Sequence, residues 1–272
     1  MTFNKSESEK RINEFQSTFL SMKEDEPNKI NIKSNELFEN DARNNMIKWL
    51  AFLCDTLNFN LQTLIRSVLI FDKFISTSEI CNLDNEQLTQ EKLNLITIAC
   101  LSLGTKLEEI NCNYVSFFTE KVLNLPNCEI FSVKDLTNME LIILKELNYN
   151  TLYTTSIDFV SFYLDIFQYF FNPNQQFSQN IQKLAENMMK QNIMTNAYLN
   201  MTQDEYAFAC LNQTFIQIGM MGAVNQIRNT LMLFNINNLM KKNKSLDDNN
   251  ECNDSDDIQH NLEVNLLTLP SF

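Results

Sequence analysis

The chain has 272 residues, 44% of them hydrophobic, which is enough for one or two domains. Only three glycines and four prolines occur, and because strand-rich folds need many such turn residues, the composition favours an all-α protein. The net charge of −13 repels phosphates and argues against a nucleic-acid partner.

The first predicted helix covers residues 8–22. Its apolar residues recur at spacings of three and four: Ile12, Phe15, Phe19 and Met22. One apolar stripe of this kind is typical of an amphipathic helix that docks on another part of the protein. A polar link with Pro27 follows, so we assign residues 1–39 to an N-terminal helix and linker.

Five helices are predicted in residues 40–152. We place them at 41–57 with a cap at Asn40 or Asp41, at 61–76, at 89–105, near 114–122, and from Ser132, which has capping-box spacing to Asp135. The third is apolar in nearly every direction, which predicts a central position. Its small residues would let neighbouring helices approach closely: Ala99, Ser102 and Gly104.

A second helical set is predicted in residues 153–242, beginning at a cap on Thr155 or Ser156. One member, residues 206–222, is again apolar nearly all round and contains small residues: Ala207, Ala209, Cys210, Gly219 and Gly222. We therefore expect an all-α fold of two tandem five-helix domains. Residues 243–272 are rich in acids and predict a flexible tail.

The seven cysteines form no C-x-x-C pair. Cys54, Cys100 and Cys210 fall in apolar helical runs, so we interpret them as buried hydrophobic residues rather than metal ligands. No apolar run predicts a membrane span, and the first residues lack the apolar core of a signal peptide. We expect a protein of the nucleus or cytoplasm, without cofactor, metal or membrane partner.

Four groups of residues between 40 and 152 follow one another in an order and spacing that can be compared with a known family. They are Arg43, Met46, Ile47, Trp49 and Leu50; Leu64, Asp72, Phe74 and Ser76; Ala99, Cys100, Lys106, Glu108 and Glu109; Met139, Glu140, Leu144, Leu147 and Tyr149. Their order and spacing resemble the cyclin N-terminal box, and the flanking helices resemble the A- and B-type layout. The resemblance implies a non-catalytic subunit that forms a heterodimer with a cyclin-dependent Ser/Thr protein kinase and activates it in cell-cycle control.

The resemblance also implies residue roles. Arg43 and Asp72 would form a structural ion pair, because buried charges need partners. Lys106 and Glu140 would hold main-chain groups of the kinase's αC helix and activation segment. Beside them, an apolar cleft would accept a kinase side chain: Leu103, Leu107, Leu144 and Tyr149. From the residues alone, Lys106 and Glu140 are equally well explained as a helix-end cation and a solvated acid.

One departure concerns substrate docking. Many cell-cycle cyclins recruit Arg-x-Leu motifs through an apolar patch on the first helix of the box. Here Ala42 and Asn45 occupy apolar places of that patch, while Met46 and Trp49 are kept. The lost contact area and the added amide predict that such docking is weak or absent. An Arg-x-x-Leu sequence, residues 66–69, falls in a helix predicted to be buried, so a destruction signal is not expected there.

Other functions fit less well. An enzyme is disfavoured because His260 lies in the acidic tail and adjacent Glu108 and Glu109 point about 100° apart on a helix. A transcription-initiation factor with paired cyclin folds would need a basic surface and a zinc ribbon. The main alternative is a cyclin-fold scaffold that binds a protein partner without activating a kinase.

Overall fold

A computed structural model of the chain describes residues 5–27, 29, 41–77, 89–110, 121–122, 125 and 131–247. Every regular element in these residues is helical, which confirms the all-α prediction. The chain divides into two units, residues 1–227 and 228–272, and the first unit contains the N-terminal helix and most of both helical sets. Among the described residues, no helix has the length and apolar character needed to cross a membrane.

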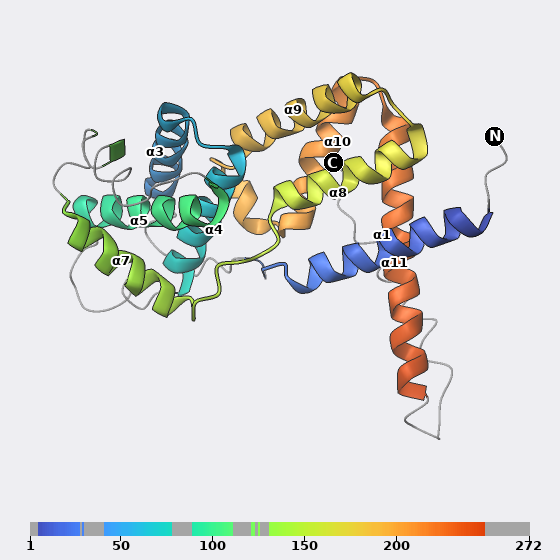
Figure 1. Cartoon of the computed structure of the whole chain (residues 1–272), viewed down its shortest axis with the longest axis horizontal. Helices are drawn as coiled ribbons and strands as arrows, with labels where there is room; N and C mark the ends of the chain where they lie inside the picture. Colours follow the sequence, from blue (N-terminus) through green and yellow to red (C-terminus); the bar gives the residue numbers. More distant parts are fainter. Residues whose placement is uncertain are drawn as a thin grey trace. The chain divides into compact units, whose positions relative to one another are not determined.

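The N-terminal helix α1 (Lys5–Glu24) packs on α8 (Ser156–Phe171), and Figure 1 shows the two helices. The buried ring of Phe15 lies 6.1 Å from Phe162 and 5.7 Å from Tyr169, and buried Phe19 stacks on Phe162 at 5.9 Å. Aromatic contacts of this kind bury large apolar areas. They attach α1 to the second helical set rather than to the first.

Polar contacts hold the end of α1 against α10 (Gln203–Gln217). Lys23 Nζ lies 3.0 Å from Asp204 Oδ2 and also pairs with Glu26, whose carboxylate accepts a 2.6 Å bond from the Asp204 main-chain N–H. The buried Tyr163 hydroxyl of α8 donates to the same aspartate. Asp204 therefore joins α1, α8 and α10 at one point.

The first helical set comprises α3 (Ala42–Leu57), α4 (Leu61–Thr77), α5 (Gln90–Glu108) and α7 (Val133–Glu146) in the described residues. As predicted for the third helix, α5 packs on each of the other three. Eleven of its 19 residues are buried. The helix predicted near residues 114–122 lies outside the described residues, apart from residues 121–122.

Gly104 allows the close contact of α5 with α4. A methyl group at this position would overlap Ser67 Oγ and lie 3.1 Å from the Thr63 carbonyl oxygen. Ser67 Oγ already donates to that carbonyl at 2.7 Å, so the hydroxyl is fixed in place. Ala99 and Ser102 are also buried, in agreement with the predicted role of small residues on this helix.

The helix starts follow the predicted capping with one exception. At α7, Asp135 accepts from the Ser132 main-chain N–H at 2.9 Å, and Ser132 Oγ accepts from the Asp135 N–H at 3.2 Å. At α3, the Asp41 side chain does not cap the helix, and Asn40, the other residue predicted for this cap, lies outside the described residues. The Asp41 backbone is left-handed, with φ of 55°, and its carboxylate instead accepts from the Asn44 amide at 3.1 Å.

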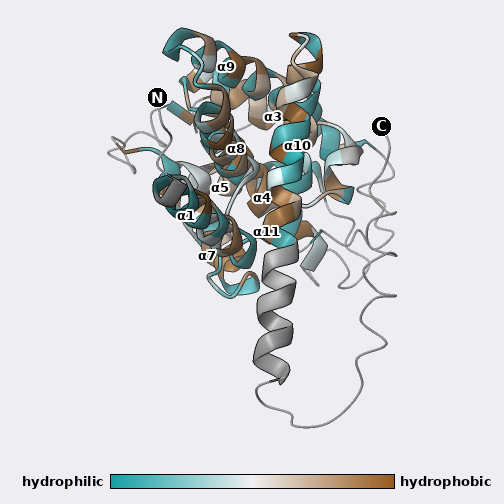
Figure 2. Cartoon of the chain, turned by 90° about the vertical axis from the view of Figure 1, so that its right-hand side faces the viewer, coloured by the Kyte–Doolittle hydropathy of each residue, from teal (hydrophilic) through white to brown (hydrophobic). Residues whose placement is uncertain are grey.

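The second helical set comprises α8, α9 (Gln175–Asn192), the 3-10 helix η3 (Asn196–Asn200), α10 and α11 (Met221–Asp247), whose residues from 228 onward belong to the second unit. As expected of a central member, α10 packs on both α8 and α9. In Figure 2, hydrophobic and hydrophilic stretches alternate along single helices, as in amphipathic helices that bury one side.

Two glycines predicted to lie within the central helix of this set lie outside it. α10 ends at Gln217, so Gly219 and Gly222 lie outside it. Gly219 has φ of 74° in the turn that follows, and a Cβ at either glycine would meet no atom within 4 Å. Gly219 therefore ends a helix, and neither glycine brings helices together. α11 continues to Asp247, five residues into the segment predicted as a tail, and residues 248–272 lie outside the described residues.

Candidate functional site

The structure brings Lys106 and Glu140 together where the end of α5 meets the middle of α7. Lys106 Nζ lies 2.6 Å from Glu140 Oε2. The lysine side chain is 39% exposed, whereas that of the glutamate is 8% exposed. Lys106 is also in the last turn of α5, where the helix dipole favours a cation. Glu140 thus lies in the interior of the protein, whereas Lys106 lies at its surface.

Ser102 fixes the carboxylate of this pair. It lies one turn before Lys106 on α5, so both side chains project from the same helix face. The buried Ser102 hydroxyl donates to Glu140 Oε1, while Lys106 binds Oε2. Both carboxylate oxygens therefore have donors, as a buried acid requires. From the sequence, Ser102 is predicted only as a small packing residue, because its contact with Glu140 on another helix leaves no local signal.

The four apolar residues expected beside the pair are not equally accessible. Tyr149 is 62% exposed, Leu107 is 37% exposed and Leu144 is half-buried. Leu103 is buried, so it supports this surface from beneath rather than contacting a partner directly. Tyr149 follows α7 in a left-handed conformation with φ of 59°, and its main-chain N–H donates to the Leu144 carbonyl at 2.7 Å. This turn directs the aromatic ring to solvent.

More apolar residues are exposed on and after α7 than predicted. Leu141 and Ile142 of α7 are exposed, and Leu152 in the segment after α7 is 72% exposed. None of the three was predicted to be exposed; for Leu141 and Ile142 the reason is that apolar residues on a helix are normally assigned to its buried side. Exposed apolar residues that are contiguous along one element mark a candidate interaction surface.

Arg43 and Asp72 form a fully buried, bidentate pair between α3 and α4. Arg43 Nε and Nη2 each lie 2.7 Å from one Asp72 oxygen, and the two side chains are 1% and 0% exposed. The guanidinium also donates to the Ile193 carbonyl at 3.5 Å and lies 5.8 Å from the centre of the Tyr198 ring. Burial raises the pKa of the Asp72 carboxyl, and Arg43 opposes that rise. Arg43 thus favours the charged form of Asp72 and joins the first helical set to the end of α9 and to η3.

The adjacent acids Glu108 and Glu109 contact different neighbours, as their positions on a helix require. Glu108 accepts from Arg66 Nε at 2.7 Å. Glu109 accepts from the Asn60 main-chain N–H at 3.0 Å and from Thr63 Oγ1 at 2.6 Å. Neither forms part of a cluster suited to a metal ion within the described ranges. Both acids hold local structure.

Arg66 also donates to the carbonyls of Thr151 and Tyr153. Arg66 and Leu69 are both buried in α4, as predicted for the Arg-x-x-Leu sequence.

The candidate docking patch on α3 is polar at its exposed positions. Asn45 is exposed, Ala42 and Trp49 are half-buried, and Met46 is buried. Phe52, one turn beyond Trp49, is 59% exposed and was not identified from the sequence. The exposed surface of α3 therefore combines the Asn45 amide of the patch with the Phe52 ring beyond it.

Residues 14–152, about half of the chain, match the family described as "Cyclin, N-terminal domain". The chain belongs to the cyclin family. It is 26% identical over 170 residues to Cyclin-D1-1 of Arabidopsis thaliana, a match that covers 62% of this cyclin and 46% of the relative. It is 25% identical over 124 residues to G1/S-specific cyclin-E1 of Danio rerio, covering 44% and 27%. This cyclin thus spans less than half the length of either relative.

Among solved structures, this cyclin resembles the X-ray structure of a viral cyclin from herpesvirus saimiri, with a TM-score of 0.55 and 16% identity. The match covers 82% of this chain and 97% of the viral chain. At this identity the likeness concerns the fold, and it confirms the predicted cyclin fold. Cyclins are regulatory rather than catalytic proteins, in agreement with the expectation of a cyclin-type regulator.

Proposed function

We propose that this cyclin binds and activates a Ser/Thr cyclin-dependent kinase through the surface around Lys106 and Glu140. The observation that carries the proposal is the half-exposed ion pair at the junction of α5 and α7. One cation and one carboxylate beside Leu107 and Tyr149 offer both polar groups and apolar area to a visiting helix. Each well-buried apolar anchor would contribute about 1.5–3 kcal/mol.

The pair suits this role because its geometry exists before the partner arrives. Ser102 and the packing of α5 on α7 hold Glu140, and Glu140 holds the Lys106 ammonium near the surface. Side chains ordered in advance lose less conformational entropy on binding. Lys106 would donate to main-chain carbonyls of the kinase, and Glu140 would accept from its N–H groups.

Activation requires that the cyclin bind the active form of the kinase more tightly than the inactive form. The active form has the αC helix turned inward, so that a Lys–Glu pair orients the ATP phosphates, and an open activation segment. Moving a kinase from 1% to 99% active takes about 5.5 kcal/mol of differential binding. Two or three apolar anchors together with the polar contacts are of this size.

The test uses the full-length cyclin with purified candidate kinases and a histone-like peptide as substrate. We expect Lys106→Ala and Glu140→Gln each to reduce the stimulated phosphorylation rate about tenfold or more. Glu140→Gln keeps the shape of a residue that is buried, so it tests the charge without removing its packing. Full activation by the double variant would contradict the proposed contact.

The matched control for charge removal is Lys190→Ala. Lys190 forms a surface ion pair with Asp55 and lies on α9 rather than on α5 or α7. It should leave activation unchanged. Thermal unfolding of each variant checks that it remains folded.

The second candidate is a cyclin-fold scaffold that binds a protein partner without activating a kinase. The departures on α3, where Ala42 and exposed Asn45 replace apolar residues, support it. In that case the kinase would be retained on the immobilised cyclin while its phosphorylation rate stayed at the basal value. Retention and rate, measured on the same samples, distinguish the two functions.

A further inference from the structure

A groove between α8 and α9 lies outside the surface described above. Its volume is about 700 Å³, within the range of ligand-binding sites, and Arg11 of α1 contributes to one side. The helices meet at a tight turn, where Asn172 is left-handed and Asn174 caps α9 by accepting from the Phe177 N–H at 2.8 Å. Three helices therefore converge on this groove.

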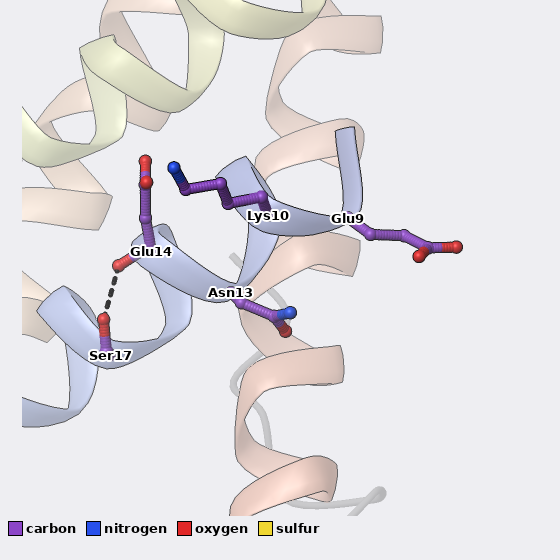
Figure 3. Close-up of a pocket in the computed structure, with 5 residues that line it drawn as sticks. All are labelled: Glu9, Lys10, Asn13, Glu14 and Ser17. Atoms are coloured by element: carbon purple, nitrogen blue, oxygen red, sulfur yellow. Dashed lines mark hydrogen bonds between the residues drawn. The ribbon is translucent and has the colours of Figure 1, made fainter. Parts of the chain in front are cut away.

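At a second hollow, of about 510 Å³, helices do not converge in this way. It is lined by α1 alone, through Glu9, Lys10, Asn13, Glu14 and Ser17. Figure 3 shows these side chains pointing in different directions, with Ser17 Oγ donating to the Glu14 carbonyl at 2.9 Å. It offers no set of groups aimed at one ligand.

Side-chain amides dominate the lining of the α8–α9 groove. Five of its twelve lining residues are amides: Gln168, Asn172, Gln175, Gln179 and Gln182. An amide side chain both donates and accepts hydrogen bonds. A row of amides is therefore complementary to a ligand that donates and accepts hydrogen bonds along its whole length. The main chain of an extended peptide is such a ligand. A phosphate would require several cations here, and Arg11 is the only Lys or Arg among the lining residues.

Ser178 gives an independent indication of a ligand. It lines the groove from α9 and is 8% exposed, yet its hydroxyl has no hydrogen-bond partner among the described residues. Buried polar groups in native proteins are nearly always paired, and an exception requires an explanation. The oxygen itself has less than 1 Å² of accessible surface, so a peptide N–H or C=O lying in the groove would supply the missing partner after the short serine side chain turns its hydroxyl into the groove.

Asp165 gives the groove its charge preference. It is the one carboxylate in the lining, and no described cation lies close enough to form a salt bridge with it. Arg11 acts on Asp165 electrostatically. However, the Arg11 guanidinium is paired with Glu14 at 3.1 Å and lies 4.8 Å from the centre of the Phe15 ring. The net charge of −13 adds a long-range attraction for cations.

We propose that the groove between α8 and α9 binds an extended, polar segment of a partner protein, with a Lys or Arg side chain of that segment paired to Asp165. The groove amides and the Ser178 hydroxyl bind the main chain of the segment. This surface is formed by α1, α8 and α9, whereas the proposed kinase contact is formed by α5 and α7. The two proposals therefore succeed or fail in separate experiments.

The test presents the labelled full-length cyclin to an array of peptides of about ten residues, long enough to span about 30 Å when extended. The flanking positions are random polar residues, and the central position is Arg, Lys, Glu or Met. We expect peptides with central Arg or Lys to retain the cyclin about fivefold better than peptides with central Glu. Equal retention, or a preference for Glu, would overturn the proposal.

Asp165→Asn should abolish this preference. The matched control is Glu24→Gln, which removes one exposed carboxylate from the other end of α1, outside the groove. The control should keep the preference for Arg and Lys. If both variants behave like the unaltered protein, Asp165 does not select the peptide and the proposal is wrong.

Ser178→Ala separates a binding hydroxyl from a structural one. Removing an unpaired buried hydroxyl should raise the melting temperature of the free cyclin, while retention of the basic peptides falls about threefold. A lower melting temperature with unchanged retention would show that the hydroxyl serves the fold and would contradict its proposed role.

Discussion

The Arg43–Asp72 and Lys106–Glu140 ion pairs have almost the same length, 2.7 and 2.6 Å, but different surroundings. Both ends of the first are buried, whereas the lysine of the second is 39% exposed. A buried pair is held by the fold and leaves the fold with unsatisfied charge when one partner is removed. A pair with one exposed member can exchange partners with a visiting protein. Burial, rather than distance, distinguishes the structural pair from the candidate contact.

The largest expected effect comes from breaking the buried pair. Arg43→Ala would leave Asp72 charged or force its protonation in a site that already raises its pKa, so we expect a loss of about 3–5 kcal/mol in the free energy of unfolding. Urea denaturation measures it. The double variant Arg43→Met with Asp72→Leu should recover a large part of this loss, because it removes both charges. A loss below about 1 kcal/mol for Arg43→Ala, as for surface pairs, would abolish the contrast.

A smaller effect is expected from removing the hydroxyl that binds Glu140 in the half-exposed pair. Ser102→Ala removes one of the two donors to Glu140, so we expect a loss of about 1.5 kcal/mol in stability, typical of a hydrogen bond to a charged group. It should also weaken kinase activation, because Glu140 and Lys106 are then less firmly placed. Ser102→Thr, which keeps the hydroxyl, is the comparison variant. Unchanged activation by Ser102→Ala would mean that the pair does not depend on this anchor.

The smallest effect concerns the exposed cap of α7, the helix that carries Glu140. Bonds from the Ser132 hydroxyl and main-chain N–H lower the pKa of Asp135. Since the folded pKa is below the unfolded value of about 3.9, the contribution of this cap is complete above that value and disappears as the pH falls through the folded pKa. NMR titration of the Asp135 carboxyl should show this lowered pKa, and Ser132→Ala should return it toward the ordinary value. An unchanged titration in that variant would exclude the cap as its cause.

Local patterns in the sequence predicted much of the fold. The spacing of apolar residues predicted the positions of α1, α4 and α5 to within a few residues, and the Ser132–Asp135 spacing predicted the start of α7. These features depend on neighbouring residues only. The end of α10 was misplaced because apolar composition continues past Gln217, and only the backbone shows that Gly219 turns the chain.

For the candidate site, the family resemblance indicated which charged residues to compare, but not their surroundings. The bond from Ser102 to Glu140 and the contact of Arg43 with the Ile193 carbonyl join residues 38 and 150 positions apart. Such contacts depend on how helices pack and leave no local signal. The exposure of Phe52, Leu141 and Ile142 was missed for the opposite reason, since an apolar residue in an amphipathic pattern is normally expected to be buried.

Gly104 links the two kinds of pair. α4 carries Asp72 and α5 carries Lys106, and the missing side chain at Gly104 sets the separation of these two helices. Any larger residue there would push the helices apart and so shift Lys106 relative to the buried core. The absence of a methyl group at one interior position thereby fixes the position of a surface cation. A substitution in the core could therefore alter the binding surface without changing any residue on that surface.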